Sequence, residues 1–303
     1  MGKKNSYKLI MKLRHFSEYL FFLIFVWIVN VFGILRVKYI AKPLSLFIYY
    51  LLPIRKKVVL KNLRIAFPSL SESELRKIAL KNYYSFAITF LEILALRYTD
   101  ISDVNKMMFV DNQELLKKNV EKKKGLILLT AHFGNWELGG IIMGQLIGKP
   151  LHVLSKRQKN IFVADWLKEM RERFGNTEIY IGMSVRELYA ALKNNKIIGI
   201  VGDQRAPQKS VKVKFFNQAT PFFSGFTNLA LKLRTPIIVA IPVRQKDDKY
   251  KVFLEELDYE ELQEATDENI AKMIQKYISI LQKFIMLYPD QWFWMHNIWK
   301  YYR

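Results

Sequence analysis

The chain contains no cysteine among its 303 residues. This absence excludes disulfide bonds, thiolate metal sites and a cysteine nucleophile. Histidine is also scarce, and its four positions are His15, His132, His152 and His296. Imidazole is the side chain best suited to act as a base near neutral pH, so few positions can supply one.

Several common catalytic motifs are missing as well. The sequence has no G-x-S-x-G, which argues against a serine esterase. Residues 144–149 read G-x-x-x-G-K, one residue too short for a P-loop and followed by Pro150 where Ser or Thr is required. No H-E-x-x-H occurs, and His132 has no evident third ligand beside it. We therefore expect neither a metal nor a cofactor.

Acidic residues are outnumbered, with 27 Asp and Glu against 48 Lys and Arg, for a formal charge of +21. A surface of this charge favours an anionic partner, such as nucleic acid, an acidic protein or phospholipid head groups. The first 65 residues hold 13 Lys and Arg and one acid, Glu18. These basic residues flank two apolar segments, which favours a membrane rather than nucleic acid.

The first apolar segment, Tyr19–Leu35, is interrupted only by Asn30, and the second runs from Pro43 to Ile54. About 17–25 residues are needed for a helix to span a bilayer, and a signal peptide would have a shorter apolar region followed by small residues. We predict an N-terminal membrane helix within residues 1–60. A tilted span, a re-entrant hairpin broken near Pro43 and an interfacial helix all fit this pattern.

Residues 61–303 are predicted to form one α/β domain, with a mostly parallel sheet flanked by helices. Strand-like apolar segments alternate with helical segments, which is the pattern of such sheets. Ser71 and Glu74 form a capping box that begins a helix extending to about Arg97. Strands are expected near 126–130, 150–155, 178–181, 197–202 and 236–243, and helices near 113–121, 136–147, 160–174, 184–194 and 225–234.

A polar turn follows the first of these strands. It contains His132, and Glu137 lies one turn into the next helix. A carboxylate that binds one imidazole nitrogen fixes the tautomer and leaves the other nitrogen as a base. A histidine that merely caps the strand, with Glu137 favouring the helix N-terminus, fits the spacing equally well.

Two later residues are predicted to share the cleft with His132. Asp203 follows the strand at 197–202, and Arg157 follows the strand at 150–155. The carboxyl ends of parallel strands open on one edge of a sheet, so these side chains should meet there. Arg157 could bind a phosphate or a developing oxyanion, with Asp203 holding Arg157 or an acceptor group in place. Arg171 has weaker support, and Asp203 capping a loop is the alternative.

The segment T-A-H-F-G-N-W-E-L at 130–138 resembles the catalytic block of the bacterial lipid A biosynthesis acyltransferases, a family with a His-x4-Asp/Glu motif. Further matches to the family are N-L-R-I-A-F-P at 62–68, F-F-x-x-x-x-P-x-x-x-G at 215–225 and P-x-Q-W-x-W-x-H-x-x-W-K at 289–300. The resemblance implies a glycerol-3-phosphate acyltransferase-like fold and an O-acyltransferase. His132 and Glu137 would then be catalytic, and the substrate-binding residues would be Asn135, Arg157, Asp203, Gln204 and Gly225.

The same resemblance implies the substrates and the location. The donor would be a fatty acyl thioester on acyl carrier protein, or acyl-CoA, and the acceptor a hydroxyl of a glycolipid such as a lipid A precursor. The enzyme would lie at the bacterial inner membrane with its catalytic domain on the cytoplasmic face. Acylation of a lysophospholipid or an amino-lipid, and a non-catalytic lipid-binding protein, are the alternatives.

Overall fold

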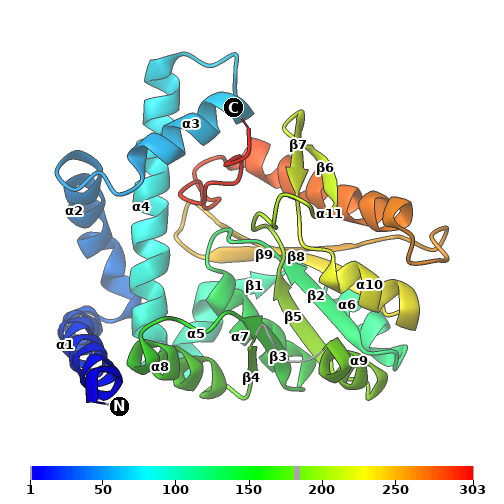
Figure 1. Ribbon diagram of the computed structural model, residues 1–303, viewed down its shortest axis with the longest axis horizontal. Helices are drawn as coiled ribbons and strands as arrows, with labels where there is room; N and C mark the ends of the chain where they lie inside the picture. Colours follow the sequence, from blue (N-terminus) through cyan, green and yellow to red (C-terminus); the bar gives the residue numbers. More distant parts are fainter. Residues whose placement is uncertain (1, 181–184, 303) are drawn as a thin grey trace.

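A computed structural model describes residues 2–180 and 185–302 of the chain. Its centre is a seven-stranded sheet in the order β1-β9-β8-β2-β5-β3-β4 (Figure 1). Strands β8 and β9 pair antiparallel, and the other neighbours in this sheet pair parallel. The predicted α/β fold with a mostly parallel sheet is therefore confirmed.

The strands of this sheet are β1 (Met108–Val110), β2 (Leu126–Thr130), β3 (Leu151–Ser155), β4 (Thr177–Tyr180), β5 (Ile197–Val201), β8 (Ile237–Arg244) and β9 (Tyr250–Glu256). The helices around it are α3 (Lys56–Ala66), α4 (Glu72–Leu96), α5 (Ile101–Met107), α6 (Gln113–Glu121), α7 (Trp136–Ile147), α8 (Ile161–Glu172), α9 (Val185–Lys193), α10 (Gly225–Leu233) and α11 (Asp267–Leu287). All the predicted strands and helices are present near their expected bounds, although residues 181 and 184 lie outside the described residues. The structure adds β1, β9, α11 and a separate hairpin of β6 (Lys212–Phe215) and β7 (Gln218–Pro221).

The central strand β2 contributes to a core on each face of the sheet. Ile127 and Leu129 belong to the core cluster that contains α3, α10 and α11. Leu126 and Leu128 belong to the cluster that contains α7 and α8. Successive side chains of a strand point to opposite faces, so β2 reaches both cores and is buried on both sides.

Helix α4 runs along one side of the sheet and contacts both cores. It begins with the predicted capping box, in which Ser71 accepts from the backbone N–H of Glu74 and Glu74 accepts from that of Ser71. Its second half contributes Thr89 and Glu92, both buried, toward the centre of the molecule.

Helix α1 (Gly2–Phe32), a 3-10 turn (Ile34–Arg36) and α2 (Val37–Tyr50) lie on the outer side of α4 (Figure 1). Gly33 separates the helices with φ of 73°, which favours glycine. Residues Met11–Phe32 of α1 are long and apolar enough to cross a membrane, and 11% of that stretch is buried. The predicted division near residue 60 falls within α3 and stays a prediction.

Candidate active site

The turn between β2 and α7 holds His132 at the carboxyl edge of the sheet. Two of its residues account for its shape. Gly134 has φ of 49°, and a Cβ atom there would lie 2.1 Å from the carbonyl oxygen of Pro242. Asn135 caps α7, its Oδ1 accepting from the backbone N–H of Leu138 at 2.9 Å. Glycine and a capping residue are therefore both required where the strand becomes a helix.

His132 is hydrogen-bonded to Asp203 rather than to Glu137. The two atoms His132 Nδ1 and Asp203 Oδ1 are 2.7 Å apart, and Asp203 Oδ2 accepts from the backbone N–H of His132 at 3.0 Å. Parallel pairing aligns Thr130 of β2 with Val201 of β5, so the residues two places beyond each strand meet. The predicted meeting of Asp203 and His132 at one edge of the sheet is present.

The charges of this pair stabilise each other. Burial alone would lower the pKa of His132, but the Asp203 carboxylate outweighs it, so the pKa is raised above its ordinary value. Burial would raise the pKa of Asp203, but His132 and the hydrogen bond from Trp292 lower it below its ordinary value. An ionised Asp203 accepts the Nδ1 proton, which leaves Nε2 of a neutral His132 free to act as a base.

A loop near the C-terminus completes the surroundings of His132. Trp292 Nε1 donates to Asp203 Oδ2 at 2.8 Å, and the backbone N–H of Phe293 donates to the His132 carbonyl at 3.0 Å. Asn62 and Asn82 hold the loop, and each donates from its amide to two of its backbone carbonyls. The Trp residues of the motif at 289–300 are at most 2% exposed, so they belong to the core and not to a membrane interface.

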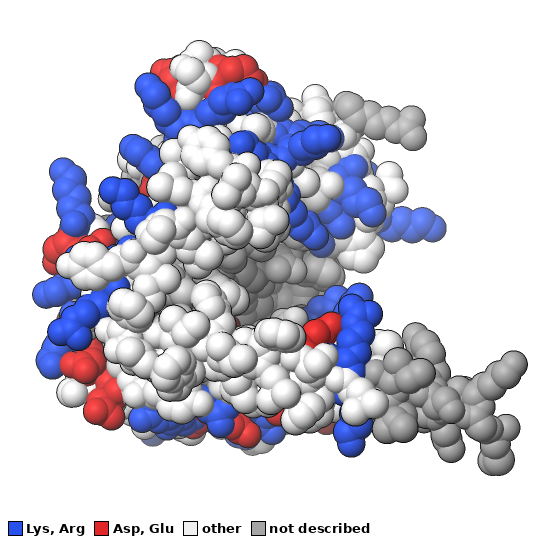
Figure 2. All heavy atoms as spheres, turned by 90° about the vertical axis from the view of Figure 1, so that its left-hand side faces the viewer, with Lys and Arg blue, Asp and Glu red and all other residues white. Residues whose placement is uncertain are grey.

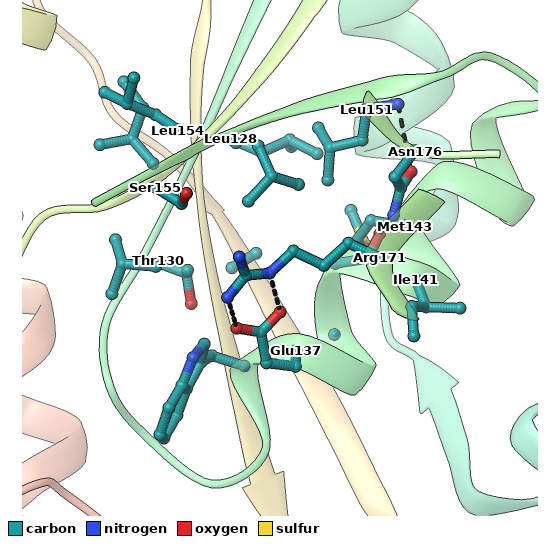
Figure 3. A pocket seen from close by; sticks show the side chains of 18 of the residues that line it. Leu128, Thr130, Glu137, Ile141, Met143, Leu151, Leu154, Ser155, Arg171 and Asn176 are labelled. Atoms are coloured by element: carbon teal, nitrogen blue, oxygen red, sulfur yellow. Dashed lines mark hydrogen bonds and ion pairs between the residues drawn. The ribbon is translucent and has the colours of Figure 1, made fainter. Parts of the chain in front are cut away.

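Glu137 is paired with Arg171, which corrects the predicted contact with His132. Arg171 Nε donates to Glu137 Oε2 at 2.9 Å and Nη2 donates to Oε1 at 2.6 Å (Figure 3). A third bond joins Arg171 Nη1 to Glu178, whose side chain is 1% exposed. Burial would raise the pKa of Glu137, but Arg171 lowers it below its ordinary value, so the carboxylate is ionised.

A cavity of about 230 Å³ extends from His132 under helix α7. Its polar lining includes His132, Glu137, Arg171 and Gln204, and also Thr130, Ser155, Lys156, Gln158 and Asn176. Apolar groups form the larger part of the lining, and Figure 3 shows several of these beyond the Arg171–Glu137 pair. They include Leu128, Ile141, Met143, Leu151, Leu154, Ala240 and Val252. Glycines at 139, 140 and 199 also line the cavity and leave space where side chains would fill it.

Arg157 lies outside this cavity, contrary to the prediction. Its neighbours Lys156 and Gln158 line both the cavity and an adjoining surface groove, whereas Arg157 lines the groove alone. All three residues follow the end of β3 and are exposed. The Arg157 side chain is 56% exposed, with Nη2 3.7 Å from Asp165 Oδ1. Asp203 therefore holds His132 and not Arg157.

The other predicted substrate-binding residues are placed differently from one another. Gln204 is at the site, its Nε2 lying 3.4 Å from Nε2 of His132. Asn135 is fully buried, and both ends of its amide are bound by protein groups, so it shapes the turn and does not face a substrate. Gly225 begins α10 and is not among the residues that line the cavity.

Two polar residues near the site were not predicted well from the sequence. Glu92 was not predicted at all, and Arg171 was given only weak support. Glu92 Oε2 accepts from Asn135 Nδ2 at 2.9 Å and from the Tyr250 hydroxyl at 2.7 Å. Burial raises the pKa of Glu92 to about 6. Both residues lie within helices and carry no motif, so charge in an otherwise apolar helical face was the one available signal for Glu92.

Residues that could bind a metal do not cluster in the part of the chain that the structure describes. No group of three or more His, Cys, Asp or Glu side chains there could hold an ion. His296 is also engaged, since its Nε2 accepts from the backbone N–H of Arg205 at 3.1 Å. Burial lowers the pKa of His296 to about 4, so this imidazole is neutral.

Nearly the whole chain matches a known protein family. Residues 7–301 match the bacterial lipid A biosynthesis acyltransferase family. The chain belongs to this family. It is therefore an acyltransferase, and its family acts in lipid A biosynthesis.

Two relatives from Escherichia coli (strain K12) and one from Haemophilus influenzae illustrate the similarity. The chain is 27% identical over 252 residues to the E. coli lipid A biosynthesis palmitoleoyltransferase, and 26% over 250 residues to its lauroyltransferase. Each alignment covers 81% of this chain and 79% of the relative. The H. influenzae lipid A biosynthesis acyltransferase is 27% identical over 256 residues, which cover 81% of this chain and 78% of the relative.

Proposed function

We propose that this protein is a membrane-bound O-acyltransferase that moves a fatty acyl chain from acyl carrier protein to a hydroxyl of a lipid A precursor. The observation that supports this most directly is the 2.7 Å contact of His132 Nδ1 with Asp203 at the mouth of a largely apolar cavity. The imidazole base thus lies next to a cavity that could hold an acyl chain. Family membership supports the same reaction class.

His132 acts as the general base in this proposal. Its Nε2 removes the proton from the acceptor hydroxyl as that oxygen attacks the thioester carbonyl. The tetrahedral intermediate then collapses, the C–S bond breaks, and the imidazolium returns the proton to the thiolate of the carrier. Asp203 keeps Nδ1 protonated and stabilises the imidazolium between these two steps.

Glu137 and Arg171 organise the polar end of the cavity. The bidentate pair fixes the carboxylate and guanidinium in one geometry, since two parallel hydrogen bonds constrain both groups. Glu137 also lies at the beginning of α7, where the backbone N–H groups of Trp136 and Glu137 have no partner within the helix. Together with Arg171, these N–H groups are suited to stabilise the negative charge of the intermediate.

The proposed substrates match the charge and shape of the protein. The formal charge of +21 suits an acidic carrier protein as donor. The groove beside the cavity contains Arg14, Lys156, Arg157 and Lys159, which suits an acceptor that carries phosphate. We propose that the enzyme lies at the inner membrane with its catalytic domain on the cytoplasmic face.

The test is a turnover assay with purified enzyme in vesicles. Acyl carrier protein loaded with a fatty acid, or acyl-CoA, is offered with a lipid A precursor or a lysophospholipid, and the product is weighed by mass spectrometry. We expect a mass increase of one acyl chain on the lipid A precursor, which disappears with His132→Ala. Acylation of the lysophospholipid alone would refute the proposed acceptor, and transfer from CoA alone would refute the proposed donor.

A further inference from the structure

The face of the molecule formed by α1 and α2 is largely apolar. Figure 2 views this face directly and shows a broad surface of uncharged residues with Lys and Arg around its margin. On α1 most of the exposed apolar residues follow a helical stripe, and the exposed ones are Leu13, Phe16, Leu20, Phe21, Ile24, Trp27, Ile28, Val31 and Phe32. On α2 and the following turn they are Tyr39, Leu46, Phe47, Tyr50, Leu51, Leu52 and Ile54.

The opposite side of α1 is packed against the catalytic domain. The Tyr19 and Phe162 ring centroids are 5.6 Å apart, and those of Phe22 and Trp166 are 5.1 Å apart, which joins α1 to α8. Farther along α1, Val26 and Val29 are at most 2% exposed and belong to the core cluster that contains α4. Asn160 also donates to the His15 carbonyl at 2.8 Å.

These contacts attach residues 15–29 of α1 to the domain, which is about 21 Å of helix axis. Helix α8, to which the first part is attached, carries Asp165, Lys168 and Glu169, each at least 44% exposed on its side chain. If α1 crossed a hydrocarbon core of about 30 Å, it would carry these charges into lipid. The unattached ends of α1 are too short to cross alone.

We infer that α1 does not span the membrane but lies in the plane of one leaflet, together with α2, as the surface that binds the lipid bilayer. Both helices lie within the face seen in Figure 2, with their apolar stripes outward. Such helices bury one apolar face at the boundary of head groups and acyl chains. This inference rests on the proposed membrane-bound function and assigns the surface responsible.

Charge at the ends of the apolar segments fits an anionic phospholipid surface. Lys12 and Arg14 flank the beginning of the exposed stripe, Arg36 and Lys42 lie beyond its break, and Arg55 follows the last apolar turn. Lys and Arg extend their charged ends to the head groups while their stems cover apolar surface. Helices that lie in the plane of the bilayer bring all of these basic residues to the head groups of one leaflet.

The absence of cysteine allows a direct test. Single variants Lys12→Cys and Arg36→Cys mark the two ends of the apolar part of α1 at exposed basic positions, which the inference places at the head groups and outside the hydrocarbon. Ala265→Cys, in the loop between β9 and α11 on the far side of the sheet from α1 and α2, marks the side of the catalytic domain (Figure 1). Each variant is placed in sealed vesicles, treated with a membrane-impermeant maleimide, and treated again after detergent to give total labelling.

We expect all three cysteines to react from the same side of the vesicle, to the same fraction of the total within about two-fold. Protection of Lys12→Cys, Arg36→Cys or both, while Ala265→Cys reacts, would overturn the inference, and protection of one of them alone would mean that α1 spans the bilayer. Acyl transfer is measured on the same vesicles. Same-side labelling without acyl transfer to any offered lipid would refute the proposed function and leave the lipid-binding surface standing.

Discussion

Both carboxylate oxygens of Glu137 accept hydrogen bonds from Arg171, at 2.9 and 2.6 Å, so Glu137 is turned to the guanidinium and Nδ1 of His132 is left to Asp203. The two residues of the His-x4-Glu motif therefore belong to two separate hydrogen-bonded pairs and do not form a pair with each other. His132 and Asp203 form the pair that handles the proton, and Glu137 and Arg171 form the pair that fixes charge beside it. Substitutions in the two pairs should therefore change activity in different ways.

Arg171→Lys should lower kcat by about 10–100-fold, because lysine cannot make two parallel bonds and a hydrogen bond to a charged group contributes about 1.5–3 kcal/mol. Arg64→Lys is the matched control, since Arg64 also bonds to both carboxylate oxygens of one glutamate, Glu72, but is 49% exposed and lines neither the cavity nor the groove. It should retain kcat within about two-fold. Equal losses in steady-state kinetics of the two variants would show that Arg171 has no special part in the reaction.

Asp203→Asn should lower kcat by as much as about 10⁴-fold, as expected when a carboxylate that fixes a catalytic imidazole is replaced. His132→Ala should be at least as severe, and the double variant little worse than His132→Ala alone, because the residues act as a unit. Thermal unfolding of each variant serves as the control for folding. Losses that multiply in the double variant would contradict a joint role.

The pH dependence of kcat/KM should show an acid limb above about pH 6.5, the ordinary pKa of histidine. The base must be neutral, and the pKa of His132 is raised by Asp203, so activity should rise with pH through that raised value. In Asp203→Asn the Asp203 carboxylate is gone, and burial, which lowers the pKa of His132, is opposed by Glu137 alone. The limb of the residual activity should therefore shift to lower pH, and an unchanged limb would assign it to another group.

Glu92→Gln should stabilise the protein at neutral pH. Burial raises the pKa of Glu92 to about 6, from an ordinary value of 4.5. The folded state thus binds a proton more tightly than the unfolded state, so stability falls as pH rises between these values, by about 2 kcal/mol. Glutamine keeps an acceptor for Asn135 and Tyr250, which both bond to one oxygen.

Unfolding in urea at pH 5 and pH 7.5 measures this effect. The gain of Glu92→Gln over the natural chain should be present at pH 7.5 and smaller at pH 5. Glu92→Leu, which removes the acceptor, should instead be less stable at both values, because Asn135 and Tyr250 would be buried without a partner. A gain that is the same at both pH values would contradict the raised pKa as its cause.

Gly140→Leu should favour shorter acyl donors. A Cβ at Gly140 would lie 3.8 Å from Leu151 Cδ2, which is ordinary contact, so the added side chain fits and extends into the cavity. Each methylene that can no longer be buried loses about 0.8 kcal/mol, or about four-fold in kcat/KM. Competition among donors of different length measures the preference. Leu146→Met, a half-exposed change on the same helix, should leave it unaltered.

Much of this fold followed from the alternation of apolar strands and helices along the sequence. The meeting of His132 with Asp203 also followed, because both come directly after adjacent parallel strands. The placement of Arg157 did not, since it depends on the course of the exposed loop after β3. Strand β9 was missed because it pairs antiparallel at the edge of the parallel region and is only half-buried along much of its length.

Hydrogen-bond partners that are distant in the sequence could not be predicted either. Arg171 is 34 residues from Glu137, and Trp292 is 89 residues from Asp203. Neither spacing corresponds to a motif, because both contacts arise only when α8 and the C-terminal loop pack on the sheet. The sequence showed that Glu137 lies close to His132 along the chain, but not that Arg171 would bind it instead.

The in-plane position of α1 and α2 has a consequence for how the enzyme meets its acceptor. Protein and lipid held in the same leaflet encounter each other by lateral diffusion, so the collision rate depends on the number of acceptor molecules per unit area. Adding buffer to a vesicle suspension would leave the turnover of each enzyme molecule unchanged, whereas adding inert phospholipid to the vesicles would lower it. The effective concentration of the acceptor is then a property of the membrane and not of the surrounding solution.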